Sequence, residues 1–122
     1  MAVPEGAAIA GRHRTARLVL RGYMIFELEI VDQAAWEEYR RVAGPVLAAS
    51  GGRFMVSSQR IEPLEGGWSP ASISVVEFPS FEAASTFYHS DEYQLTVPLR
   101  QKAARGRGIL VGSTPLEDAD QT

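Results

Sequence analysis

The sequence predicts a single α+β domain of the ferredoxin-like class, with elements in the order β-α-β-β-α-β. Four segments have the composition and alternation of strands, and two longer segments have helical spacing behind a capping residue. Two βαβ halves of this kind give a four-stranded antiparallel sheet with both helices on one face. The second face of the sheet also carries apolar residues, which another layer must cover. We therefore expect a second copy of the chain to pack there, which would give a barrel-like homodimer.

The expected strands are four short apolar segments. Residues 22–31 alternate apolar and acidic side chains in their second half, as a half-buried strand does. Residues 53–59 and 71–79 are joined by a loop rich in glycine and proline, which predicts an antiparallel hairpin with a long connection. Residues 106–112 form a short last strand.

The expected helices begin at residues that cap a helix well. Asp32 precedes a helix over 33–50, and its carboxylate would accept from free N–H groups of the first turn. Pro45 lies inside this segment, so we expect a kink there. Ser80 caps the second helix, and a broken helical piece around Pro98 should follow it.

The composition excludes several classes of protein. The chain has 122 residues, 45% of them apolar, no cysteine, and a net charge of −3. Disulfides and thiolate metal sites are thereby excluded, and no apolar run reaches the roughly 18 residues that a membrane helix needs. Positive charge is concentrated in residues 1–21, whereas residues 22–112 are acidic, unlike a nucleic-acid-binding domain. We expect a cytoplasmic domain at 22–112, between a disordered basic extension at 1–21 and a disordered acidic tail at 113–122.

A polar cluster from Tyr88 to Tyr93 ends the second helix. His89 is the only histidine of the predicted domain, and imidazole titrates near neutral pH, so it suits proton transfer. Asp91 or Glu92 would lie within reach of the ring. The alternative is that His89 ends the helix in solvent, where the helix dipole favours a cation.

Glu77 lies in a strand among apolar residues and needs a cation if it is buried. Arg53 opens the preceding strand and is the expected partner. Either the pair is structural, across the dimer interface, or Arg53 binds a substrate oxygen while Glu77 orients it or acts as a base. In the second interpretation Arg53, Glu77 and His89 are the catalytic residues.

Four aromatic side chains are candidates for the wall of a substrate cavity: Tyr39, Trp68, Tyr88 and Tyr93. Tyrosine on an apolar helix stripe is usually part of the core, with its hydroxyl finding one partner. Trp68 lies in the glycine-rich loop, where it would be a lid over the cavity or an anchor for the loop. One histidine in the predicted domain and no cysteine argue against a metal site, so we expect no metal and no cofactor. A single axial haem ligand at His89 is the one ligation that the sequence leaves open.

Several segments resemble the family called domain of unknown function 1330: "GYMIFELEIVD", "GGRFMVSSQ", "LEGGWSP", "SVVEFPSFEAASTFYHSDEYQ" and "LRQKAARGRGILVG". This family belongs to the dimeric α+β barrel superfamily, and the resemblance covers about residues 22–112. It implies a homodimer of ferredoxin-like protomers and no particular reaction. Family members more often have asparagine at His89 and proline at Asp91, so the imidazole is either a feature of this chain or drift.

Two functions from different classes remain. The first is a small cofactor-independent enzyme that performs proton-transfer chemistry on a hydrophobic, polyketide-like or lactone-like small molecule. Cyclisation, isomerisation, dehydration or oxygenation would each use such chemistry, and the wider superfamily includes enzymes of these kinds, some in secondary metabolism. The second is a non-catalytic homodimeric ligand-binding or accessory module, in which the cluster after Tyr88 only ends a helix.

Overall fold

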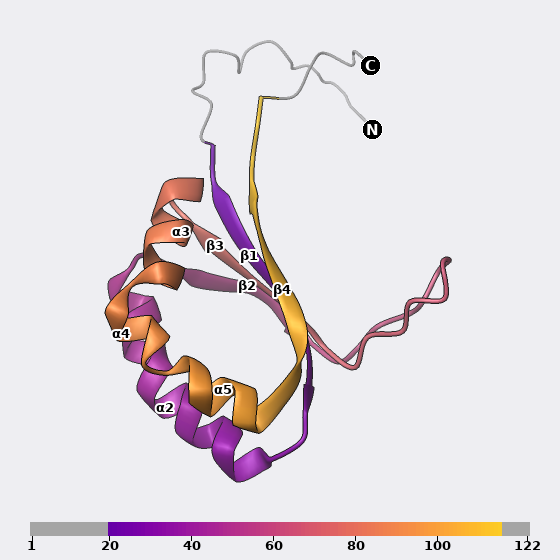
Figure 1. Cartoon of the computed structure of the whole chain (residues 1–122). Helices are drawn as coiled ribbons and strands as arrows, with labels where there is room; N and C mark the ends of the chain where they lie inside the picture. The colour runs from indigo at the N-terminus through magenta and orange to yellow at the C-terminus, as the bar shows by residue number, and fades with distance from the viewer. Residues whose placement is uncertain (1–19, 116–122) are drawn as a thin grey trace.

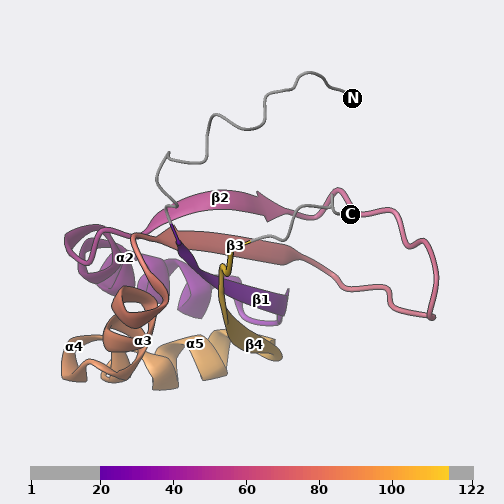
Figure 2. The same cartoon turned by 90° about the horizontal axis from the view of Figure 1, so that it is seen from above.

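The computed structural model describes residues 20–115, and these form one sheet with all helices on one of its faces (Figures 1 and 2). The elements follow the predicted order. They are β1 (Gly22–Ile30), α2 (Gln33–Ala49), β2 (Arg53–Ser58), β3 (Ile73–Phe78), α3 (Phe81–His89), α4 (Asp91–Gln94), α5 (Val97–Ala103) and β4 (Ala104–Gly112). The predicted disorder at 1–21 and 113–122 falls almost wholly outside the described residues.

The sheet is antiparallel, with the strand order β2-β3-β1-β4 of the ferredoxin-like fold. β1 is central and pairs with β3 from Gly22–Phe78 to Glu27–Ile73, and with β4 over its whole length. A register shift between Phe54 and Val56 marks a bulge in the edge strand β2. β4 begins at Ala104, two residues before the predicted start, because its pairing with β1 extends to Ile30.

The helices begin where the capping residues predicted. The Asp32 carboxylate accepts from the Ala35 N–H, and the Ser80 hydroxyl accepts from the Ala83 N–H. α2 runs through Pro45 to Ala49 as one helix, so the expected kink does not divide it into two pieces. The segment after α3 is broken into α4 and α5, as predicted, with Pro98 in the first turn of α5.

The core lies between the helices and the face of the sheet that carries Met24, Val76 and Phe78. On α3 the buried residues are Ala84 and Phe87, and the rings of Phe78 and Phe87 pack 5.3 Å apart. The other face has no helix and carries an alternating set of apolar and charged side chains, which the strand register places together: Tyr23, Ile25, Glu27, Ile73, Val75, Glu77, Arg107, Ile109 and Val111.

A long connection between β2 and β3 projects beyond the end of the sheet (Figures 1 and 2). Leu64 is almost fully exposed within it, and Gly66 and Gly67 both have positive φ angles, which a non-glycine residue adopts only with strain. The predicted hairpin with a long connection is therefore present.

Candidate active site

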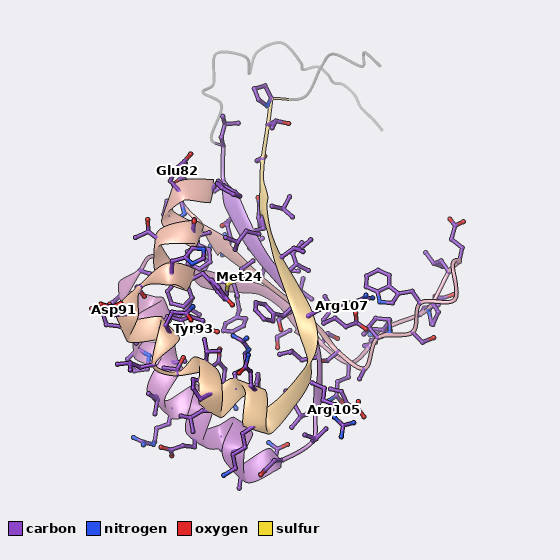
Figure 3. All side chains as sticks on the ribbon, viewed as in Figure 1. Met24, Glu82, Asp91, Tyr93, Arg105 and Arg107 are labelled. Carbon is purple, nitrogen blue, oxygen red and sulfur yellow. The ribbon has the colours of Figure 1, made fainter. Side chains whose placement is uncertain are left out.

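A cavity of about 750 Å³ lies between the helix-covered face of the sheet and helix α2. Its floor is apolar and includes Met24, Phe26, Leu28 and Val76 from the two central strands. Figure 3 shows Met24 and Tyr93 in this interior, whereas Arg107 lies at the opposite side of β4. A volume of this size is within the range of small-molecule sites in proteins.

Three polar side chains from three helices converge on this apolar space. The Tyr39 hydroxyl of α2 lies 2.8 Å from the Tyr93 hydroxyl of α4, and Nη1 of Arg100, on α5, donates to the same Tyr93 oxygen at 2.8 Å. All three residues line the cavity. Tyr93 is only 1% exposed and Arg100 only 9%. The guanidinium carbon of Arg100 lies 4.9 Å from the centre of the Phe26 ring, which is a cation–π distance.

Both ends of this hydrogen-bonded cluster have fixed protonation states at neutral pH. Burial raises the pKa of Tyr39 far above its ordinary value; Tyr93 raises it further, and Arg100 only partly opposes the rise. Burial acts to lower the pKa of Arg100, but charge interaction and hydrogen bonding with Tyr93 raise it, and the net direction is upward. Tyr39 is therefore a neutral hydroxyl, and Arg100 is a cation.

A second, smaller cavity of about 360 Å³ lies between β4 and the helices α3 and α5. Tyr88 and His89 line it, and it shares Met24, Phe26, Leu28 and Arg100 with the larger cavity. The His89 ring lies edge-on to Tyr88, with ring centres 5.2 Å apart, and the residue is exposed. The Tyr88 ring packs 5.6 Å from Tyr93. The space with the tyrosine hydroxyls thus adjoins the space with the imidazole along these shared residues.

Arg53 and Glu77 form the predicted pair, but on the helix-free face of the sheet. Nε of Arg53 donates to Oε1 of Glu77 at 3.1 Å, and the two residues are direct cross-strand neighbours within one chain. The Tyr23 hydroxyl donates to Oε2 of Glu77 at 3.4 Å, and Arg21 lies 3.9 Å from that oxygen. Neither Arg53 nor Glu77 lines either cavity. Their catalytic roles stay predictions and would require a site on this other face.

Trp68 also lies away from both cavities. Trp68 acts to lower the pKa of Glu27, which the strand register places on the helix-free face, so the indole lies near that carboxylate. Glu27 has a lowered pKa, mainly because Arg107 donates to it at 2.8 Å. Trp68 is absent from the lining of both cavities, and its two predicted roles, as a lid or as an anchor for the loop, stay predictions.

Arg100 is the main feature that the sequence interpretation missed. Its position carried a signal, because Val97, Arg100 and Ala103 are spaced like one buried stripe of a short helix. An arginine in such a stripe marks either a helix end that reaches solvent or a buried cation. Among residues 20–115 no group of three histidine or acidic side chains could hold a metal ion, and no helix is long and apolar enough to cross a membrane.

The model of one protein family, described as a domain of unknown function (DUF1330), matches residues 21–114. Comparison with curated proteins gives no significant match. Solved structures do match. A protein of unknown function from Rhodopseudomonas palustris has 22% sequence identity and a TM-score of 0.62 over 85% of this chain and 88% of its own.

Two further solved structures have the same fold at lower identity. A DABB family protein with a ferredoxin-like fold from Mesorhizobium loti is 17% identical, with a TM-score of 0.52 over 80% of this chain and 97% of its own. SnoaB, a cofactor-independent oxygenase from Streptomyces nogalater, is 9% identical, with a TM-score of 0.50 over 80% of this chain and 94% of its own. At these identities the likeness establishes the fold alone.

Proposed function

Because this chain belongs to the DUF1330 family and has the ferredoxin-like fold of the dimeric α+β barrel proteins, we propose that it is a small cofactor-independent enzyme of proton transfer. The observation that carries the proposal is the apolar cavity of about 750 Å³ into which Tyr39, Tyr93 and Arg100 converge. The substrate would be a hydrophobic, polyketide-like or lactone-like molecule with an enolisable carbonyl group.

The cavity supports this chemistry through its hydrogen-bond donors. When a base removes a proton from the carbon next to a carbonyl, the electron pair of that C–H bond moves toward the oxygen and creates an enolate. Buried, preorganised donors stabilise such an oxyanion more strongly than water does. Arg100 and the tyrosine hydroxyls are donors of this kind. Cyclisation, isomerisation, dehydration and oxygenation can all begin from the enolate.

We propose His89 as the group that takes up and returns the proton. It lines the smaller cavity, which meets the larger one at Arg100. An imidazole exchanges protons readily near neutral pH. The role first predicted for Arg53 as oxyanion donor is thereby transferred to Arg100, which lines the cavity.

We further propose that the protein acts as a homodimer in the cytoplasm. The helix-free face of the sheet supports the proposed dimer. Ile109 of β4 is 61% exposed there, and it is the cross-strand neighbour of Ile25 of β1. An exposed apolar sheet face of this kind is normally covered by a second layer.

Hydrogen exchange into a simple ketone tests the proposed function without knowledge of the natural substrate. 1-Tetralone is hydrophobic, is small enough for the cavity and has enolisable protons. In D₂O at neutral pH the protein should accelerate the exchange of these protons above the buffer rate, as followed by proton NMR. His89→Ala should lower the accelerated rate about 10²-fold or more, which is the usual contribution of a general base.

A cavity-filling variant supplies the control. Gly44 lines the cavity, and a Cβ atom added there meets nothing within 4 Å. Gly44→Leu should therefore block the cavity while leaving the fold intact, and should abolish the exchange. Exchange that survives both substitutions would arise elsewhere on the protein and would contradict the proposal.

One observation favours the alternative function, a ligand-binding module. Glu37 is the one carboxylate on the wall of the large cavity, and it lies half-exposed beside Arg40. His89, the one imidazole among the described residues, lines only the smaller cavity. The ligand-binding module would be favoured by three results together. A ligand binds in the cavity of the wild type, fails to bind to Gly44→Leu, and shows no accelerated hydrogen exchange.

A further inference from the structure

Arg100 is a buried cation that no carboxylate neutralises among the described residues. The five ion pairs within residues 20–115 join other partners, from Arg21–Glu77 to Arg107–Glu27. Arg100 instead contacts the Tyr93 hydroxyl and the aromatic ring of Phe26. A charge removed from water without an opposite charge is costly, so buried charges are normally paired.

The acidic side chain of the same cavity wall is engaged at the rim. Glu37 accepts from Nε2 of Gln33 at 2.9 Å and from Nη1 of Arg40 at 3.5 Å. Its side chain is 58% exposed. Glu37 thus balances the charge of Arg40 near solvent and leaves the interior cation without a counter-ion.

The polar cluster in the cavity offers donors. Tyr39 and Tyr93 have two hydroxyl protons and one hydrogen bond between them, so one O–H remains free to donate whichever of the two is the donor in their mutual bond. Arg100 has five N–H donors and no acceptor. A ligand that satisfies this cluster must bring acceptor oxygens.

We propose that the ligand of this cavity is an aromatic monocarboxylic acid whose carboxylate binds Arg100 and the free tyrosine hydroxyl. A single guanidinium matches a single negative charge in fork geometry, whereas a phosphate dianion would leave one charge uncompensated in an apolar cavity. The aromatic body would lie on the apolar floor, near Phe26. This inference deepens the proposed function and rests on it only where the ligand is also taken as the substrate.

Binding of 2-naphthoate and of its neutral amide, 2-naphthamide, tests the inference by isothermal titration calorimetry. The two probes have nearly the same shape and differ in charge. The wild type should bind 2-naphthoate at least about tenfold more tightly than the amide, because the carboxylate supplies the missing counter-ion. Arg100→Gln should remove this preference and bind both probes equally.

Arg105→Gln is the matched control, because it removes the same charge from an exposed position of β4 outside both cavities. It should retain the tenfold preference. Should Arg100→Gln not fold, the comparison of the two probes on the wild type still decides. Equal binding of both probes, loss of the preference in Arg105→Gln, or tighter binding of 2-naphthyl phosphate than of 2-naphthoate would each overturn the inference.

The two proposals fail separately. If 2-naphthoate binds through Arg100 but 1-tetralone shows no accelerated exchange, the acid-binding site stands and the enzymatic function fails. If exchange is accelerated but the carboxylate gives no preference, the enzymatic function stands and the acid-binding site fails.

Discussion

At the scale of single residues, Tyr93 connects the apolar core to the polar cluster of the cavity. Its ring packs 4.5 Å from the ring of Phe87, while its hydroxyl contacts both Tyr39 and Arg100. Because the buried Tyr93 hydroxyl has two hydrogen-bond partners, it holds both its own ring and the Arg100 guanidinium in position. The position of Arg100 in the cavity therefore depends on a residue that also belongs to the core.

The raised pKa of Tyr39 predicts a specific dependence of stability on pH. In the unfolded chain a tyrosine ionises near pH 10, whereas the folded protein retains the proton to higher pH. The stability gained from this difference is complete below about pH 10 and is lost as the pH rises toward the folded value. The melting temperature of the wild type should therefore fall more steeply above about pH 10 than that of Tyr39→Phe.

Circular dichroism melts from about pH 8 to 11 measure this effect, because they span the unfolded pKa of tyrosine. The remaining tyrosines are the same in both proteins, so the difference between the two slopes belongs to position 39. Parallel slopes would show that Tyr39 titrates alike in the folded and unfolded states.

At the scale of elements, two glycines show how closely the strands and helices approach. A Cβ atom on Gly106 of β4 would lie 1.9 Å from the Glu27 carbonyl oxygen of β1, so the neighbouring backbones of β1 and β4 have no room for a side chain there. Gly44 of α2 faces open cavity space instead. One glycine is required by packing, and the other weakens its helix.

Alanine at these two positions should change stability in opposite directions. Gly106→Ala should lower the free energy of unfolding by at least about 2 kcal/mol, because the β1–β4 pairing must shift. Gly44→Ala should raise it by roughly 0.5–1 kcal/mol, since alanine forms helix better than glycine. Urea denaturation at a fixed protein concentration measures both, and a neutral Gly106→Ala would contradict the close approach.

The sequence predicted the elements well because each carried a local signal. Asp32 and Ser80 cap helices through their own side chains, and the Arg53–Glu77 pair follows from adjacent strands. The location of the site had no local signal. Both faces of β3 are apolar enough to be buried, so the pattern does not tell which face the helices cover. Arg100 is buried because α5 crosses Phe26, a contact between segments far apart in the sequence.

At the scale of the whole molecule, the helix-free face is the surface through which we propose that two chains associate. Ile109→Lys should dissociate the proposed dimer at micromolar concentration, because an unpaired ammonium group in an apolar interface is strongly unfavourable. Leu95→Lys is the matched control, since Leu95 is 81% exposed at the end of α4, away from that face. Sedimentation velocity should give twice the chain mass for the wild type and the control, and the single mass for Ile109→Lys.

The opposite outcome is equally clear. A wild type that sediments as one chain at micromolar concentration would leave the apolar face without its expected cover. The proposed dimer would then be wrong, whereas the cavity would remain, because one chain supplies all of the side chains that line it in the described structure.

The larger cavity and the helix-free face lie on opposite sides of one sheet. In a pair of chains joined through that face, the two sheets would pack about 10 Å apart. Both sheets would then lie between the two bound molecules. Neither bound molecule could contact the other or the interface between the chains. Binding of a ligand to one chain would then leave the ligand affinity of the other chain unchanged. The dimer would bind its two ligands without cooperativity.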